Sequence, residues 1–261
     1  MSLYTERSGD GDLPLVCLHG WGLNLRVFDG LRDDLAASRC VITVDLPGHG
    51  ASPWDATRAD AAAQASWLLE VLPARCVLLG WSLGGQLALE IARLAPARIA
   101  RLVLVATTPR FVAEDGWPHG MTESVMQGFA AQLARDWHAT VEDFLQLQVR
   151  GSRDATAALA ALRQALREHG EAQPEALAAG LRILETLDLR AAAPRIDIET
   201  LIISGQHDRI TPPGAATWLA AAMPGARVIE LPRAGHAPFL SHAPDFTRAL
   251  RDFLGDFRDA A

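Results

Sequence analysis

The chain has 261 residues, 49% of them hydrophobic, and a formal net charge of −7 at pH 7. This length can bury the core of one domain and leaves room for an embedded subdomain. The negative charge argues against nucleic acid as a partner, and no apolar stretch approaches the roughly 20 residues needed to cross a membrane. All basic side chains are arginine, so lysine-based Schiff-base chemistry is excluded.

Cys17, Cys40 and Cys76 each stand in a short apolar run. An odd number of such cysteines is typical of buried free thiols in a reducing compartment, and none has the spacing of metal ligands. Residues 1–7 have neither a basic nor a hydrophobic segment, so no secretion signal is expected. We expect a cytoplasmic protein, and a monomer, with no metal or other cofactor.

Short apolar runs alternate with helix-like stretches along most of the chain, which is typical of βαβ units around a parallel sheet. The predicted fold class is therefore α/β, with a mostly parallel central sheet flanked by helices. The predicted strands are 15–18, 41–44, 76–79, 102–105, 200–203 and 227–231, with helices such as 59–72 and 85–94 between them.

The alternation stops between about residues 110 and 186, where no convincing strand is found. Amphipathic patterning there predicts four helices, at 123–137, 141–149, 155–167 and 174–184. A helical block between two strands predicts a lid over one end of the sheet. The predicted organisation is a core of residues 1–109 and 187–261, with 110–186 as a helical lid (cap) insertion.

The segment Gly80-Trp81-Ser82-Leu83-Gly84 follows an apolar strand and precedes a helix, with the serine at the apex of the turn. A sharp strand-to-helix turn exposes the serine hydroxyl, and the flanking glycines make room for the strained backbone. The N-terminus of the following helix favours the negative charge that develops in acyl transfer. The pattern predicts that Ser82 is a nucleophile.

A serine nucleophile needs a general base and a carboxylate that orients the base. Of eight histidines, His236 is the one in a loop between a late strand and the last helix, so it is the predicted base. Asp208 stands just beyond the strand at 200–203, at the carboxyl end where catalytic groups of such sheets gather. Asp188 and Asp197 precede their strand, so Asp208 is the predicted acid.

Backbone N–H groups must stabilise the developing oxyanion. The first predicted donor is Leu83 N–H, directly after the nucleophile, and the second is Trp21 N–H in the loop after the strand at 15–18. We expect His19 to hold the shape of that loop. The turn from Asp45 to Gly50 is interpreted as scaffold.

Together, His19-Gly20, the turn from Asp45 to Gly50, the Ser82 turn, Asp208 and His236 resemble the α/β-hydrolase superfamily from about residue 15 to residue 253. The resemblance implies the α/β-hydrolase fold with the lid inserted after the strand at 102–105. Serine at the nucleophile position excludes the haloalkane dehalogenase and epoxide hydrolase branches, which carry aspartate there.

A closer similarity is carried by four segments: His19-Gly20-Trp21-Gly22-Leu23-Asn24, Gly80 to Gly85, Leu184 to Arg190, and His236 to His242. These are similar to the biotin-synthesis esterases, the pimeloyl-acyl-carrier-protein methyl ester carboxylesterases. The resemblance implies hydrolysis of a methyl ester at the far end of a seven-carbon acyl chain carried on phosphopantetheine, with methanol leaving. It also implies an acyl-carrier protein as a transient partner.

Such a substrate needs an apolar channel for its acyl chain. The residues predicted to bind it are Trp21, Trp81, Leu83, Phe144 and Leu147, although Phe144 and Leu147 could instead pack the lid on the core. Acyl-carrier proteins are acidic, and a local excess of arginine between residues 149 and 167 could guide one. The predicted docking residues are Arg150, Arg153, Arg163 and Arg167; Ala139, Asp143, Thr156 and Ala160 stand where the family pattern leads one to look for arginine.

Three other readings stay open. The chain could be a general short-chain carboxylesterase without a carrier partner, which rates on carrier-bound and free esters would separate. It could be a ligand-sensing receptor that keeps the triad, which rapid turnover would exclude. It could also use the same scaffold for carbon–carbon bond hydrolysis or cofactor-free haloperoxidation.

Overall fold

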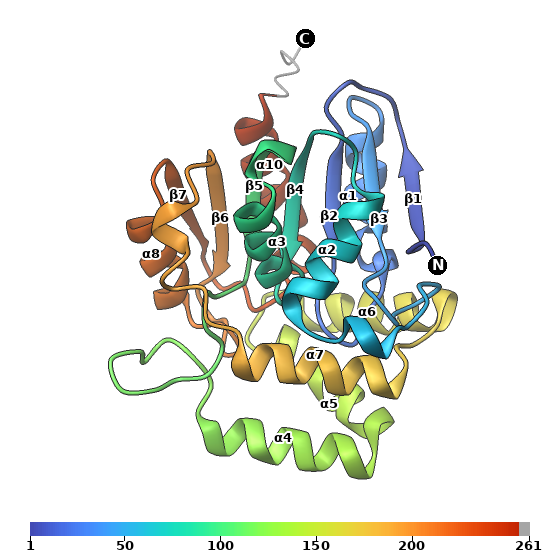
Figure 1. Ribbon diagram of the computed structural model, residues 1–261, viewed down its shortest axis with the longest axis vertical. Coiled ribbons are helices and arrows are strands. Elements are labelled where there is room, and N and C mark those ends of the chain that lie inside the picture. Colours follow the sequence, from blue (N-terminus) through green and yellow to red (C-terminus); the bar gives the residue numbers. More distant parts are fainter. Residues whose placement is uncertain (256–261) are drawn as a thin grey trace.

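The computed structural model describes residues 1–255, and its centre is a seven-stranded sheet in the order β1-β3-β2-β4-β5-β6-β7 (Figure 1). β1 pairs antiparallel with β3, and every other neighbouring pair is parallel. The mostly parallel α/β sheet predicted from the sequence is therefore confirmed. The strands are β1 Thr5–Ser8, β2 Leu15–Leu18, β3 Val41–Val44, β4 Cys76–Trp81, β5 Ile99–Val105, β6 Thr200–Gly205 and β7 Ala226–Leu231.

Helices cover both faces of the sheet. In Figure 1, α2 and α3 lie in front of the strands and α10 lies behind them. The strands at the centre are buried on both sides, which explains their continuous apolar runs. The core helices are α1 Asp29–Ala36, α2 Ala61–Val71, α3 Leu83–Leu94, α8 Pro213–Ala222, α9 Pro238–Ser241 and α10 Ala243–Leu254.

β1 was missed by the sequence analysis. Its residues are Thr5-Glu6-Arg7-Ser8, and none of them is fully buried. This edge strand forms because its backbone pairs with β3, from Thr5 opposite Val44 to Ser8 opposite Val41. A polar edge strand has no apolar alternation to reveal it.

The predicted helical block lies between β5 and β6 as four helices, α4 Glu123–Arg135, α5 Trp137–Val149, α6 Ala155–His169 and α7 Pro174–Thr186. Figure 1 shows α4, α5 and α7 below the sheet. The two ends of the block run side by side. Arg110 and Asp188 form an antiparallel β-bridge, and Leu189 N–H donates to Pro109 C=O at 2.8 Å. The chain thus enters and leaves the block at neighbouring points of the core. The predicted core range 187–261 includes 256–261, which lie outside the described residues.

All three cysteines are buried free thiols, as predicted. Burial raises the pKa of Cys76 to about 12, so this thiol stays protonated at neutral pH. Within residues 1–255, no helix is both long enough and apolar enough to cross a membrane.

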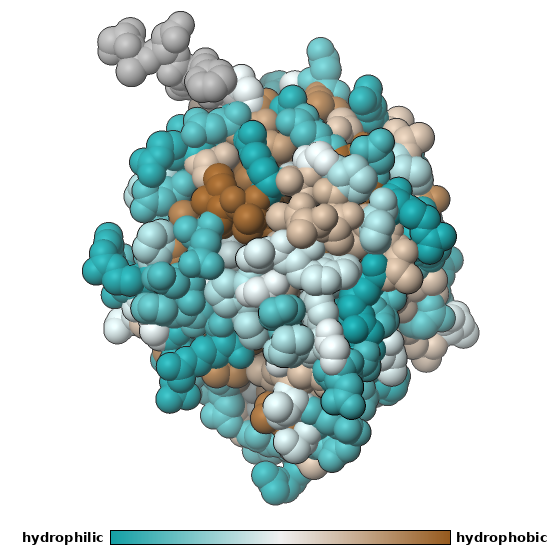
Figure 2. Space-filling view, turned by 90° about the vertical axis from the view of Figure 1, so that its left-hand side faces the viewer, coloured by the Kyte–Doolittle hydropathy of each residue, from teal (hydrophilic) through white to brown (hydrophobic). Residues whose placement is uncertain are grey.

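The opposite edge of the sheet, at β7, faces the viewer in Figure 2, where an apolar cluster in the upper half is surrounded by more polar side chains. Val228 in β7 is 38% exposed. Arg227 and Glu230 in the same strand are exposed charges, and the Arg227 guanidinium lies 5.1 Å from the ring centre of Phe253. Charged side chains on an edge strand disfavour pairing with another chain.

Candidate active site

Ser82 occupies a strained turn between β4 and α3, with φ 57° and ψ −119°. A Cβ on Gly80 would lie 2.3 Å from Gly84 C=O, and a Cβ on Gly84 would lie 2.4 Å from Leu18 C=O, so only glycine fits at either position. The neighbouring strand fixes the turn, because Ser82 N–H donates to Val105 C=O at 3.0 Å. A strained residue held by its surroundings is typical of a functional site.

Ser82, His236 and Asp208 form one hydrogen-bonded chain. Ser82 Oγ lies 2.9 Å from His236 Nε2, and His236 Nδ1 lies 2.8 Å from Asp208 Oδ2. A carboxylate accepts hydrogen bonds, so Nδ1 carries the imidazole proton and Nε2 is free to accept the serine proton. The three residues are 4%, 1% and 5% exposed, respectively, so the chain of hydrogen bonds is shielded from bulk water.

The Asp208 carboxylate has a full set of hydrogen bonds. Its Oδ1 accepts from Ile210 N–H at 2.8 Å and Thr211 N–H at 3.0 Å, and its Oδ2 accepts from the Thr211 hydroxyl at 2.8 Å. These donors fix the orientation of the carboxylate and hold one oxygen toward His236. Thr211 was not predicted from the sequence, where the only signal for it is a hydroxyl residue three positions after the acid.

The His236 loop is fixed from two sides. His236 N–H donates to Gln148 C=O on α5 at 2.9 Å, and His236 C=O accepts from the Trp81 indole N–H at 2.8 Å. Gly235, which precedes His236, donates its N–H to the Ser152 hydroxyl at 2.9 Å. The helical block therefore contacts the histidine loop directly.

The two predicted oxyanion donors lie beside Ser82. Leu83 N–H opens α3, and a Cβ on Gly20, next to Trp21, would lie 3.3 Å from Ser82 Cβ. Among residues 1–255, neither the Leu83 nor the Trp21 backbone N–H has a hydrogen-bond partner. Both donors are available to a substrate oxygen.

Two buried histidines hold the loop that carries Trp21. His19 Nε2 accepts from Leu46 N–H at 3.0 Å, and His49 Nε2 accepts from Gly22 N–H at 3.3 Å. Burial lowers the pKa of His19 well below its usual value and lowers that of His49 to about 4. Both rings are therefore neutral at pH 7 and able to accept, which agrees with the expected structural role of His19.

An apolar cavity of about 60 Å³ lies between Trp21 and the helical block. The Trp21 ring meets the edges of Phe129 and Phe144, each at 5.3 Å between ring centres. Among the residues predicted to bind the acyl chain, Trp21, Phe144 and Leu147 line this cavity, whereas Trp81 and Leu83 do not and instead flank Ser82. The lining residues are Trp21, Phe111, Met121, Val125, Met126, Phe129, Phe144, Leu147, Leu181 and Leu184.

The four predicted docking arginines differ in their surroundings. Arg163 forms an ion pair with Glu142 on α5, and this contact holds the pKa of the Glu142 carboxyl below its usual value. Arg150, Arg153 and Arg167 are exposed and have no acidic partner within residues 1–255. Of the four predicted docking arginines, these three therefore keep a positive charge that no acidic side chain of the described residues neutralises.

The two nearby loops add two arginines that the sequence analysis did not select. Arg209 follows the acid in sequence and lines an open groove of about 530 Å³ with Gly151 and Asp208. Arg233 lies on the His236 loop, and it and Arg153 are both close enough to His242 to lower its pKa, after burial as the main cause. Neither Arg209 nor Arg233 has an acidic partner in the described part of the chain.

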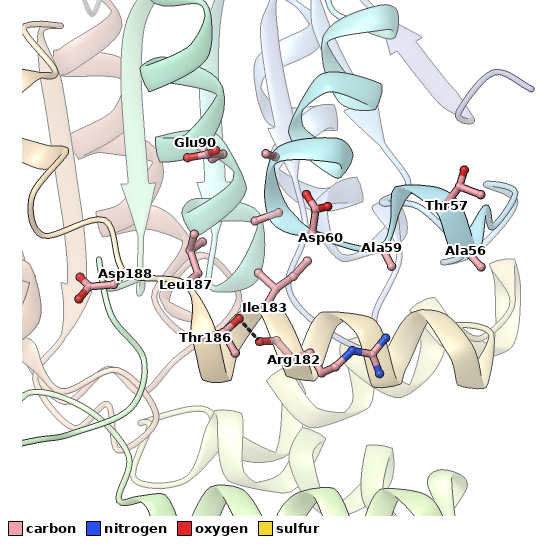
Figure 3. A pocket seen from close by; sticks show the side chains of 12 residues that line it. Ala56, Thr57, Ala59, Asp60, Glu90, Arg182, Ile183, Thr186, Leu187 and Asp188 are labelled. Carbon is pink, nitrogen blue, oxygen red and sulfur yellow. Dashed lines mark hydrogen bonds between the residues drawn. The ribbon is translucent and has the colours of Figure 1, made fainter.

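A wider groove of about 570 Å³ lies elsewhere, between the start of α2 and α7 (Figure 3). Asp60 and Glu90 lie on its core side, and Arg182 and Thr186 lie on α7. It contains none of the hydrogen-bonded residues around Ser82, and Glu90 is paired with Arg93 at 2.6 Å. Although this groove is larger than the one beside Asp208, it holds none of the predicted catalytic residues. Within residues 1–255, no group of three or more His, Cys, Asp or Glu side chains is placed to hold a metal ion.

Comparison with known proteins agrees with this geometry. The alpha/beta hydrolase fold family matches residues 14–243. The pimeloyl-[acyl-carrier protein] methyl ester esterase of Nitrosomonas europaea is 43% identical over 94% of this chain and 96% of its own length, and that of Chromobacterium violaceum is 44% identical over 97% and 98%. Among solved structures, an esterase from Exiguobacterium antarcticum superposes with a TM-score of 0.90 at 26% identity, covering 97% of this chain and 95% of that one.

Proposed function

The chain belongs to the alpha/beta hydrolase fold family, and on that premise we propose that it is a serine carboxylesterase that hydrolyses the methyl ester of pimeloyl-acyl-carrier protein in biotin synthesis. The observation that carries the chemistry is the continuous chain from Ser82 Oγ through His236 to Asp208, with spacings of 2.9 and 2.8 Å. The substrate comes from the two relatives, which match almost the whole chain.

In the proposed acylation step, Ser82 Oγ attacks the ester carbonyl while His236 Nε2 takes the serine proton. Asp208 stabilises the resulting imidazolium and keeps Nδ1 toward its own carboxylate. The Trp21 and Leu83 N–H groups donate to the oxyanion of the tetrahedral intermediate. His236 then gives its proton to the methoxy oxygen, the carbon–oxygen bond breaks, and methanol leaves.

In deacylation, water takes the place that methanol has left. His236 accepts one proton from the water as its oxygen attacks the acyl carbon, and the same proton returns to Ser82 Oγ as the acyl–serine bond breaks. The products are the free carboxyl group and the regenerated enzyme. No group beyond those of the chain and water is needed.

We assign the acyl chain to the apolar cavity and the helical block to the role of lid. Phe144 and Leu147 contribute one face of α5 to this cavity, and Trp21 belongs to the loop whose Gly20 lies beside Ser82. A methyl ester has a small leaving group, so the space around Ser82 can be narrow. Each methylene group of the acyl chain that is buried contributes about 0.8 kcal/mol to the binding free energy.

For the acidic carrier, we assign docking to the exposed arginines at the junction of lid and core, Arg150 and Arg153, with Arg167 at the far end of α6. Arg163 contributes less because Glu142 already neutralises it. Arg209 and Arg233 extend the same surface. Hydrogen bonds hold these loops together, since His207 Nδ1 lies 2.9 Å from Gly151 C=O and Gly235 N–H reaches Ser152.

The direct test is hydrolysis of pimeloyl-acyl-carrier protein methyl ester by the purified protein, with methanol and the free carboxyl product measured by mass spectrometry. The free methyl ester of pimelic acid is the comparison substrate, and Ser82→Ala is the control for contaminating esterase. We expect a much higher kcat/KM on the carrier-bound ester. Equal kcat/KM on both would make the protein a general carboxylesterase, and failure to restore growth of a biotin auxotroph lacking this esterase would reject the pathway assignment.

A further inference from the structure

Gln148 on α5 is buried, with 1% of its surface exposed, yet its side chain has no partner. Neither its Oε1 nor its Nε2 atom has a hydrogen bond within residues 1–255. Buried polar side chains almost always have hydrogen-bond partners, because leaving one unpaired costs free energy. An amide with both ends unpaired therefore indicates a place where a ligand or a reacting molecule binds.

The course of α5 shows where this amide lies. Near the start of the helix, the Val141 side chain comes within 3.7 Å of the position that a Cβ on Gly22 would take. One turn later the Phe144 ring meets Trp21, and at the end Gln148 C=O accepts from His236 N–H. One side of α5 thus extends from the loop of the predicted oxyanion donors to the predicted base.

Residues 144 and 148 are four apart and share this side of the helix. Long side chains on a helix lean toward its N-terminus, so the Gln148 carboxamide extends from the His236 end toward Phe144. Ser82 Oγ lies 2.9 Å from the Nε2 atom of His236, the residue whose backbone N–H donates to Gln148 C=O. The carboxamide thus belongs to the side of α5 that runs between the His236 loop and Phe144.

We propose that Gln148 binds and orients the water that hydrolyses the acyl-enzyme. This assignment rests on the proposed serine esterase function. The water enters beside His236 Nε2, where methanol has just left. One of its O–H groups gives its proton to Nε2, and the other donates a hydrogen bond to Gln148 Oε1. The oxygen then attacks the acyl carbon, the bond to Ser82 Oγ breaks, and the proton on His236 passes to Oγ.

The two half-reactions differ in their need for this contact. In acylation the nucleophile is Ser82 Oγ, which covalent geometry and the hydrogen bond to His236 already hold in place. In deacylation the nucleophile is a free water molecule with two protons, of which the base takes only one. A neutral acceptor for the second proton fixes the water without adding a charge beside the imidazolium. The assignment thus predicts that loss of the Gln148 amide slows deacylation more than acylation.

The test is stopped-flow hydrolysis of 4-nitrophenyl acetate by Gln148→Met, which removes the amide and keeps the side-chain length. We expect deacylation to slow by about tenfold, the equivalent of one hydrogen bond, while the acylation burst keeps nearly its normal rate. Intact-protein mass spectrometry should then show acetylated enzyme accumulating in the steady state. Gln148→Glu, which keeps an acceptor oxygen at the same length, should deacylate faster than Gln148→Met.

Gln146→Met is the matched control, because Gln146 is exposed on the same helix and bonds Glu142 rather than the site. A purely structural role of Gln148 would lower the melting temperature, whereas replacing an unpaired amide by an apolar side chain should not. Unchanged deacylation in Gln148→Met, or equal slowing of acylation and deacylation, would overturn the assignment. The acetate ester needs no carrier, so this result is independent of whether the carrier-bound ester is the substrate.

Discussion

The indole N–H of Trp81 donates a 2.8 Å hydrogen bond to the backbone carbonyl of His236, 155 residues away. Trp81 immediately precedes Ser82, so one residue of the nucleophile turn holds the loop of the predicted base. The ring is fully buried and packs edge-on against Phe239 at 4.8 Å. The distance between nucleophile and base is thereby set within one small cluster of contacts.

Trp81→Phe should keep most of the packing and leave His236 C=O without its donor. A buried carbonyl that loses its partner costs about 1–3 kcal/mol, so we expect a lower free energy of unfolding together with a lower kcat. Trp67→Phe is the matched control, since its indole N–H donates to Met1 C=O at 3.1 Å far from the site. It should lose stability and keep kcat; a Trp81→Phe enzyme with normal kcat would show that the bond does not position His236.

Replacing Ser82 or His236 by alanine should lower kcat by about 10⁴-fold or more, because the members of a triad act as a unit. Asp208→Asn should lower kcat by less than either alanine substitution. Steady-state rates on a 4-nitrophenyl ester measure the loss, and circular dichroism checks that the variants are folded. Near-normal turnover in Ser82→Ala would exclude this serine as the nucleophile.

The parts of the site that were predictable are those with a local pattern. Ser82 could be selected from the sequence because glycines, an apolar strand and a helix surround it within a few residues. Asp208 and His236 could be selected because each follows a strand that parallel pairing brings to the same edge, and the structure places the three side chains within hydrogen-bond distance. The pairing of Arg163 with Glu142 was not predictable, because it depends on how α5 and α6 pack. The unpaired amide of Gln148 had no sequence signal for the same reason: Ser82 and His236 are 66 and 88 residues away from it in the sequence, and only the fold relates them to α5.

Phe144→Ala should raise KM for a pimeloyl-type ester by about tenfold, the value of a lost apolar contact of 1–3 kcal/mol. A short acetate ester would not reach the cavity, so its KM should hardly change. Leu145→Ala is the control for packing of the helix, because Leu145 is also buried but does not line the cavity. Equal losses on both esters in Phe144→Ala would mean that this ring only packs the helical block on the core.

The neutral His49 should make the protein sensitive to acid. Burial lowers its pKa to about 4 in the folded state, whereas the unfolded value is about 6.5. Between these values the unfolded chain binds a proton that the folded chain does not, so stability is complete above about pH 6.5 and falls as pH falls toward 4. Each pKa unit corresponds to about 1.4 kcal/mol. His49→Gln should flatten this part of a urea-unfolding series against pH; an unchanged slope would assign the acid sensitivity to other groups.

If an acidic carrier docks at the junction of lid and core, Arg150 and Arg153 should steer its approach. Their attraction acts over about 8 Å at physiological ionic strength, so added salt should weaken it. Arg150→Glu combined with Arg153→Glu should lower kcat/KM for the carrier-bound ester, chiefly through slower association, and leave a small nitrophenyl ester unaffected. Arg7→Glu combined with Arg75→Glu makes the same change in net charge on exposed residues of other elements. If both double variants had the same kcat/KM on the carrier-bound ester as the unmodified enzyme, both with and without added salt, carrier docking at Arg150 and Arg153 would be rejected. If both double variants slowed equally, overall charge rather than this surface would govern association.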